Sequence, residues 1–244
     1  MRTIKLTIAY DGTRYNGWQV QKNGNTVQAE LERAIEKAAK RRSRVHAAGR
    51  TDAGVHAKGQ VAHYTGSSDI PSGKIPVAVN TFLPRDIAIL KAEEVSSGFH
   101  SQYDAKSKLY SYYIFNSRRR DPFRERYSWR VPYELDIPLM RREAGMLLGR
   151  QDFKCFQARD KRERTSVRDI LSVGIKRKGT TVRIDIEADG FLYNMVRNIT
   201  GTLVDSGRGY LPEGSVEEII GSKDRTKAGP TAPPQGLFLM KVRY

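Results

Sequence analysis

The order of apolar and polar positions predicts strands alternating with helices along the first half of the chain. Residues 4–10 are apolar at every second position, as in a strand with one buried face. Thr26 can cap a helix that runs to about Arg41, because apolar residues recur there at helical spacing. Residues 43–64 read as a strand, a glycine-rich loop and a second strand. A short helix near 75–82 and a strand near 87–95 complete this half.

The second half repeats the same kinds of element. Residues 105–116 predict a long strand, and Asp136 can cap a helix that ends before Gly149. Strands near 165–176 and 181–188 form a predicted hairpin through Lys178–Gly179. The remaining elements are a helix carrying Leu192, Met195, Val196, Ile199 and Leu203, which Gly207 and Gly209 end, and a closing strand over 237–242.

This alternation indicates an α+β fold of two α/β-type units, each a mixed or antiparallel sheet with helices on one face. The hydrophobic pattern is weakest around 96–106. We therefore expect an N-terminal domain over 1–104 and a C-terminal domain over 105–244.

The charge of the chain narrows the choice of partner. There are 43 Lys and Arg against 27 Asp and Glu, a formal net charge of +16. Such a surface favours a polyanion such as RNA, because phosphate contacts release condensed counterions. The densest basic runs lie at 40–44, 118–120 and 159–164. A solvated surface is the alternative for any single run, and solubility or a hot or salty habitat is the alternative for the charge as a whole.

Other features bear on the location of the protein. Cys155 is the only cysteine, so no internal disulfide can form, and a reducing cytoplasm fits. Residues 1–10 alternate as a strand does, so we expect no signal peptide. No stretch approaches the roughly 20 apolar residues of a membrane span. We expect a cytoplasmic protein without a membrane partner.

The segment with the clearest chemistry is GRTDAGVHA, residues 49–57. It places one carboxylate, Asp52, between Arg50 with Thr51 and the small Ala53 with Gly54. A neighbouring cation favours the ionised carboxylate, lowering its pKa by about 1–3 units, and the small residues leave room for a flat base. Taken by itself, an aspartate in such a loop is more often a turn former than a catalyst.

This segment closely resembles the signature of the TruA family of tRNA pseudouridine synthases. Further segments similar to that family follow in the expected order: YDGTRYNGWQVQ at 10–21, NTVQAELERAI at 25–35, FHSQYDAKSKLYSYYIFN at 99–116, DFKCF at 152–156, DGFLYNMVRNITG at 189–201 and TAPPQGLFL at 231–239. The resemblance implies a pseudouridine synthase fold with a central basic cleft. It also implies isomerisation of uridine to pseudouridine at positions 38, 39 and 40 of the tRNA anticodon stem-loop, by a homodimer.

The resemblance implies a role for each of five residues. Asp52 corresponds to the essential aspartate, and Arg50 to the arginine that helps extrude the target nucleotide. Tyr110 corresponds to the tyrosine that stacks on the flipped uracil, and Arg197 to the arginine that pairs with the aspartate. Leu237 corresponds to the apolar residue that lines the base pocket.

The residues themselves leave plainer alternatives open. Arg197 points about 140° from the centre of the apolar stripe of its helix, so a solvated arginine is the alternative there. Tyr110 has Tyr112 and Tyr113 as neighbours, so a half-buried strand aromatic is its alternative. An aromatic ring is nevertheless what proteins use to hold an unstacked base.

The chain departs from the family pattern at a few positions. Ser101 and Gln102 follow FH where an Ala-Arg pair is common, which removes one potential phosphate contact. Tyr193 and Asn194 stand where two histidines are frequent, and Pro234 and Gln235 where small or charged residues are common.

No ligand-binding motif beyond the RNA site is indicated. The four histidines lack metal-ligand spacing, so we expect no metal and interpret them as structural or RNA-contacting residues. No nucleotide-binding glycine motif occurs, so we expect no cofactor. A pure RNA-binding module and a nucleoside hydrolase are the rival functions; most glycoside hydrolases need a second placed carboxylate, which is not evident.

Overall fold

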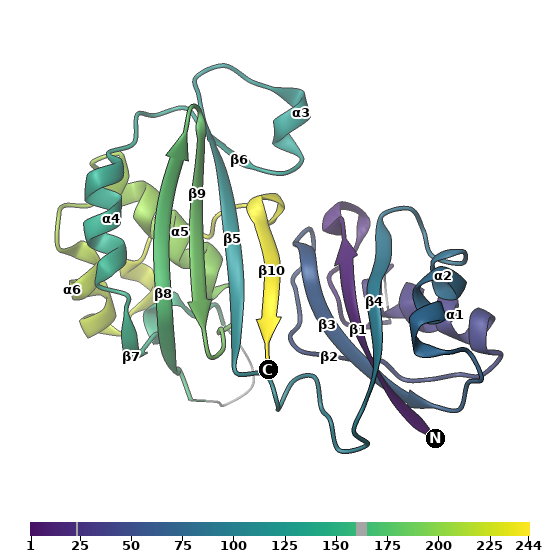
Figure 1. Cartoon of the computed structure of the whole chain (residues 1–244). Helices are drawn as coiled ribbons and strands as arrows, with labels where there is room; N and C mark the ends of the chain where they lie inside the picture. Colours follow the sequence, from purple (N-terminus) through teal and green to yellow (C-terminus); the bar gives the residue numbers. More distant parts are fainter. Residues whose placement is uncertain (23, 160–164) are drawn as a thin grey trace. The chain divides into compact units, whose positions relative to one another are not determined.

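The computed structural model describes residues 1–22, 24–159 and 165–244 (Figure 1). Its contacts group the chain into two units, Met1–Lys106 with Phe238–Tyr244, and Ser107–Leu237. The predicted C-terminal domain, 105–244, includes the closing strand, whereas the contacts group Phe238–Tyr244 with the first unit; the predicted boundary stays a prediction. The reason is a pairing between residues far apart in sequence, which a local hydrophobic pattern does not reveal.

The first unit is built on a mixed sheet. Its strands follow the order β4 (Ile87–Val95), β1 (Arg2–Tyr10), β3 (His56–Gly66) and β10 (Leu237–Arg243), and the short β2 (His46–Ala47) also pairs with β3. β1 is antiparallel to β3 and β4, whereas β10 joins β3 in parallel through Phe238 and Leu239. The alternating burial of β1 confirms the predicted opening strand.

Two helices accompany this sheet. α1 (Val27–Ala39) begins at Thr26, whose hydroxyl accepts a hydrogen bond from the Ala29 amide, as the sequence predicts. α2 (Ile75–Asn80) packs against β4, and α1 packs against α2. Two 3-10 turns, η1 (Gly12–Arg14) and η2 (Ser72–Lys74), complete the unit.

The sheet strands of the second unit follow the order β5 (Ser107–Asn116), β9 (Thr181–Ala188), β8 (Val167–Lys178) and β7 (Gly149–Asp152). These neighbours are antiparallel, and β6 (Trp129–Val131) pairs with β5 in parallel. The predicted 105–116 strand and the predicted hairpin are confirmed. The short β6 and β7 have no sequence prediction, since three or four residues carry too little periodicity.

Helices pack against this sheet (Figure 1). α4 contacts β8, and α5 contacts α4 and β5. The bounds are α3 (Pro122–Glu125), α4 (Ile137–Gly145), α5 (Met195–Gly207), α6 (Ser215–Ser222), and the 3-10 turns η3 (Lys154–Phe156), η4 (Arg225–Lys227) and η5 (Pro234–Gly236). Asp136 caps α4 as predicted, accepting from the Leu139 amide. α3 and α6 were not predicted.

Further sequence predictions can be compared with the structure at this point. The helix expected to carry Leu192 begins later, at Met195. The basic run at 159–164 lies, apart from Arg159, outside the described residues. Cys155 is a buried free thiol, and burial raises its pKa to about 11. Within the described ranges, every helix is too short or too polar to cross a bilayer.

Candidate active site

The loop that carries Asp52 connects β2 to β3 and spans residues 48–55. Asp52 is half-buried, whereas Arg50 and Ala53 on the same loop are exposed. Arg50 makes no hydrogen bond or ion pair within the described ranges. The loop therefore offers one carboxylate and one guanidinium close together in sequence, beside small residues.

Backbone hydrogen bonds hold this loop against residues 10–18. The Trp18 amide donates to the Thr51 carbonyl at 3.0 Å, and the Gly54 amide donates to the Tyr15 carbonyl at 3.3 Å. Within the loop, the Val55 amide donates to the Asp52 carbonyl at 3.1 Å. Asp52 is thus bracketed on both sides by bonds that fix its main chain.

A buried network of side-chain hydrogen bonds also supports this loop. The Tyr10 hydroxyl lies 2.7 Å from Thr51 Oγ1. Gln60 Nε2 donates to the Gly49 carbonyl at 2.8 Å and to the Tyr10 hydroxyl at 3.4 Å. Burial raises the pKa of Tyr10 to about 12, although its hydrogen bonds to Thr51 and Gln60 oppose the rise. Tyr10 therefore stays a neutral hydroxyl at physiological pH and can bond to Thr51.

Two glycines allow the 10–18 segment to approach the loop closely. A Cβ on Gly12 would lie 2.0 Å from the Val55 carbonyl oxygen, and one on Gly17 would lie 2.6 Å from the Thr51 carbonyl oxygen. Gly17 also has a φ of +85°, which other residues rarely adopt. Both glycines stand in DGTRYNGW, but the sequence does not indicate which carbonyl oxygens they face.

His56, the histidine of the 49–57 motif, fixes the start of β3. Its Nδ1 accepts from the Gly12 amide at 3.0 Å, and its ring stacks on Phe238 at 4.5 Å between centroids. Since Phe238 and His56 are also register partners in the sheet, the ring joins the loop end to β10. This arrangement gives His56 a structural role.

Arg197 occupies a distinct position on α5. Twelve of the thirteen residues of this helix are buried, and Arg197 is the exception. Its Nε donates to the Ala232 carbonyl at 2.7 Å, and its Nη1 donates to Asn194 Oδ1 at 3.2 Å. The guanidinium is therefore held by Ala232 and by Asn194 at the start of the helix, which is inconsistent with a freely solvated arginine.

Asn194 precedes α5 in the left-handed region, with a φ of +59°. Asparagine tolerates this conformation better than most residues. Its side chain at the same time accepts the hydrogen bond from Arg197. At this departure from the family pattern, Asn194 shapes the start of the helix and orients the arginine, two functions that the sequence interpretation missed.

Tyr110 and Leu237 lie in the second unit as buried side chains. Tyr110 is 7% exposed on β5, where its ring meets Phe191 edge-on at 5.1 Å. Leu237 is 5% exposed and follows Gly236, where a Cβ would meet the Tyr112 ring at 2.5 Å. The Tyr112 hydroxyl donates to the Pro233 carbonyl at 2.7 Å. Burial raises the pKa of Tyr112 and the Arg197 charge opposes that rise, which places Arg197 within electrostatic range of Tyr112.

The candidate residues thus form two sets. Arg50 and Asp52 share a clamped loop of the first unit, whereas Tyr110, Arg197 and Leu237 belong to the second. The proposed pairing of Asp52 with Arg197 stays a prediction. Within the described ranges, no group of three or more His, Cys, Asp or Glu side chains could hold a metal ion.

The position of Ser101 gives a structural reason for one departure from the family pattern. Ser101 is fully buried, and its hydroxyl donates to the His46 carbonyl at 2.6 Å. Its amide donates to His63 Nδ1 at 3.1 Å. Burial, with the neighbouring His100 and His46, lowers the pKa of His63 to about 4. His63 is therefore a neutral acceptor in the core.

Comparisons with known proteins agree over nearly the whole chain. A family model described as tRNA pseudouridine synthase matches residues 6–104 and 144–244. Proteins named tRNA pseudouridine synthase A are 48% identical in Pelobacter propionicus and 44% identical in Thermoanaerobacter sp. (strain X514), with all of both chains covered. The one in Syntrophomonas wolfei is 46% identical over all of this chain and 98% of its own.

Among solved structures, one described as a Cbf5-Nop10-Gar1 complex matches 97% of this chain. This chain covers 47% of that one, at 10% identity and a TM-score of 0.36. A TM-score this low does not establish a shared fold.

Proposed function

We propose, from the premise that this chain belongs to the tRNA pseudouridine synthase family, that it acts on uridines 38, 39 and 40 of the anticodon stem-loop with Asp52 as its catalytic carboxylate. The chain is an isomerase that converts uridine to pseudouridine in tRNA. The observation that carries the proposal for Asp52 is the clamped 48–55 loop, which fixes the backbone of one carboxylate beside small residues.

The reaction sets the requirements of the site. The N1–C1′ bond breaks, the uracil turns over, and C5 bonds to C1′. N1 gains a proton and C5 loses one, so the conversion is redox-neutral and consumes no co-substrate. The site therefore needs one ionised carboxylate near C1′, a pocket that retains the detached base, and a route for the C5 proton.

Asp52 supplies the carboxylate, either as a nucleophile at C1′ or as a base that starts glycal formation. In both roles it must be ionised and held in one orientation. The bonds from Val55, Trp18 and Gly54 support this, because they fix the backbone on either side of it. Such preorganisation accounts for much of the rate in reactions that depend on the geometry of attack.

The other four residues complete the proposed site. Arg197 pairs with Asp52 and holds its charge and rotamer, and Arg50 helps to extrude the target nucleotide. Tyr110 stacks on the flipped uracil, and Leu237 lines the base pocket. Base extrusion costs a few kcal/mol, which contacts between the +16 protein and the phosphates offset.

We further propose that the protein works in the cytoplasm as a homodimer that binds tRNA. The single buried thiol is consistent with a reducing compartment. Light scattering during size-exclusion chromatography tests the dimer: a mass of one 27.6 kDa chain at working concentration would contradict it.

Position-resolved tritium release tests the substrate proposal. Transcripts of one tRNA carry 5-tritiated uridine, with a single target uridine left at 38, 39 or 40 and the other two replaced by cytidine. We expect release from each transcript, and none from a transcript without a uridine at these positions. Release only from uridines outside the anticodon arm would refute the proposed target while leaving the isomerase activity intact.

A further inference from the structure

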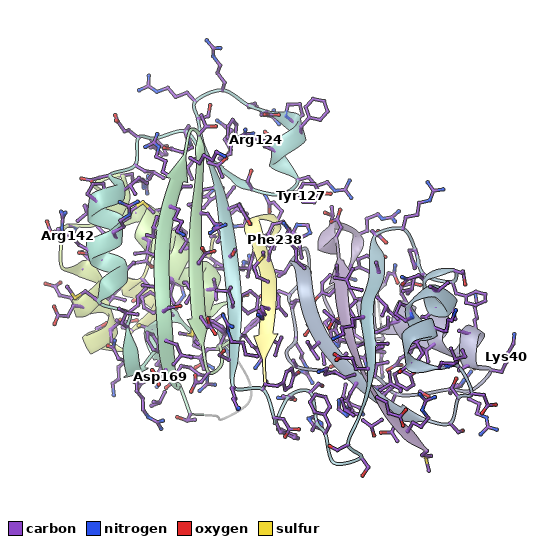
Figure 2. The ribbon with its side chains drawn as sticks, in the orientation of Figure 1. Lys40, Arg124, Tyr127, Arg142, Asp169 and Phe238 are labelled. Atoms are coloured by element: carbon purple, nitrogen blue, oxygen red, sulfur yellow. The ribbon has the colours of Figure 1, made fainter. Side chains whose placement is uncertain are left out.

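The most arginine-rich stretch of sequence in the second unit is residues 117–130, which comprise the connection from β5 to β6 and the first two residues of β6, and which we call the arginine loop. It contains six arginines, at 118, 119, 120, 124, 126 and 130, against two acids, Asp121 and Glu125. The loop lies between the two segments that the family model matches. Figure 2 shows Arg124 and Tyr127 on this connection, which also carries α3.

The loop is a folded element held at both ends. The Ser117 amide donates to the Val131 carbonyl at 3.1 Å, which closes the loop. Asp121 caps α3 by accepting from the Phe123 amide at 3.0 Å. Arg124 Nη1 donates to Thr180 and Thr181 at 3.0 and 3.2 Å, which ties α3 to the β8–β9 turn. Its side chains therefore project from a fixed backbone.

The two acids of the loop are paired with arginines inside it. Glu125 accepts from Arg120 at 2.8 and 2.9 Å, and Asp121 pairs with Arg124 at 3.4 Å. Arg118 and Arg119 are exposed, and neither pairs with an acid in the described part of the chain. The excess positive charge thus stays available at the surface, which suits a phosphate backbone.

Aromatic side chains line a hollow beside these arginines. The hollow has a volume of about 190 Å³ and is lined in part by Phe115, Phe123, Arg124 and Tyr127. Phe123 is 91% exposed and Tyr127 is 41% exposed. The Arg124 guanidinium lies 4.9 Å from the centroid of the Phe115 ring. The volume is below the usual range for a cofactor pocket and suits a single planar base.

We propose that the arginine loop is a separate tRNA-binding element, in which Arg118 and Arg119 contact phosphates and Phe123 with Tyr127 stacks on an unpaired nucleobase. This inference rests on the proposed function for the identity of the ligand. Exposed aromatics interleaved with arginines are the combination that proteins use for single-stranded nucleic acid, because rings hold bases and guanidinium groups hold phosphates.

The test measures equilibrium binding of an unmodified tRNA transcript to full-length protein across a range of salt concentrations. The double variant Arg118→Ala/Arg119→Ala should bind tRNA about tenfold or more weakly near 0.1 M salt. The plot of the logarithm of the association constant against the logarithm of the salt concentration should become less steep by roughly 1.4–1.8. Phe123→Ala should weaken binding about fivefold or more without changing the slope. The double variant Lys37→Ala/Lys74→Ala removes two exposed charges that make no ion pair in the described part of the chain, and it serves as the matched control.

Several outcomes would overturn the proposal. Wild-type affinity and slope in the double arginine variant would exclude the phosphate contacts, and an equal loss in the control would show only an effect of net charge. A changed oligomeric mass for Phe123→Ala would assign the hollow to a second copy of the chain. Binding of anionic lipid vesicles that depends on these residues, without an effect on tRNA, would assign the loop to membranes.

Binding is measured apart from turnover, so failure of this inference can be told from failure of the proposed function. If wild-type protein releases tritium while the loop variants bind tRNA normally, only the loop assignment is wrong. If wild-type protein releases no tritium but the salt slope changes as expected in the double arginine variant, the loop binds tRNA and the catalytic proposal is wrong.

Discussion

A single methyl group at Gly12 tests whether the 10–18 segment positions Asp52. In Gly12→Ala the new Cβ would lie 2.0 Å from the Val55 carbonyl oxygen and 2.6 Å from its carbonyl carbon. Real Cβ atoms keep at least 3.0 Å from such neighbours, so the two segments must separate by about 1 Å. Because the Val55 amide donates a hydrogen bond to the Asp52 carbonyl, moving Val55 also shifts the backbone of Asp52 and with it the carboxylate.

A displacement of about 1 Å at a reacting group costs roughly 100-fold in rate. We therefore expect the single-turnover rate of tritium release to fall about 100-fold in Gly12→Ala, with tRNA affinity changed less than threefold. Gly73→Ala is the matched control, because a methyl group added there would meet nothing within 4 Å and its φ is unstrained. Circular dichroism and Tm verify that both variants fold.

A folded Gly12→Ala protein that turns over at the rate of Gly73→Ala would refute the reasoning. If Gly12→Ala fails to fold, Tyr10→Phe gives a milder test. It removes the hydroxyl 2.7 Å from Thr51 Oγ1, and its rate should fall while its affinity for tRNA is retained.

Three further perturbations follow from the geometry. Asn194→Ala should be about 1–2 kcal/mol less stable than Asn194→Gly in chemical denaturation, because only glycine adopts the left-handed backbone of this position without strain. Both variants lose the hydrogen bond to Arg197, and both should slow turnover about tenfold. Wild-type stability should fall by about 1–3 kcal/mol as the pH drops from 6.5 to 4, since unfolding lets His63 take up a proton, and His63→Asn should flatten that dependence. Gly201→Ala should lower the Tm by several degrees, because its Cβ would lie 1.7 Å from the Pro230 carbonyl oxygen. Equal stability of Asn194→Ala and Asn194→Gly, an unchanged pH profile for His63→Asn, or a wild-type Tm for Gly201→Ala would contradict the respective reasoning.

The local elements of the fold could be predicted where their periodicity was long. β1, α1 and β5 follow directly from alternating or helical apolar spacing, and the caps at Thr26 and Asp136 from side-chain chemistry. The pairing of β10 with β3 could not be predicted, because it joins residues about 180 positions apart and leaves no periodic trace in either strand.

The helical pattern of α5 was informative only in part. The apolar stripe predicted the helix, but not that polar residues such as Asn198 and Thr202 on its other faces are buried as well. Asn198 Nδ2 donates to the Phe156 carbonyl at 2.7 Å, a long-range bond that no local pattern indicates. Only the structure therefore shows that Arg197 is the single half-exposed residue of a helix that is otherwise buried.

The candidate site, like the fold, could be predicted from the sequence only in part. The GRTDAGVHA motif identified Asp52 and Arg50 in sequence, because the resemblance lies in that segment. The support of the loop by Tyr10, Gly12 and Gly17 depends on close approach between segments some forty residues apart. Glycine positions alone indicate turns and do not reveal which carbonyl they face.

Tritium release from uniformly 5-tritiated tRNA transcript, measured side by side for wild type, Asp52→Ala and Asp52→Asn, tests the central claim most directly. Wild type should release tritium and form pseudouridine, while both variants should release none at an enzyme excess that saturates tRNA binding. Release by either variant at a rate near that of wild type would contradict the assignment of Asp52. Salt-sensitive binding without release by wild type would instead indicate an RNA-binding protein without catalysis.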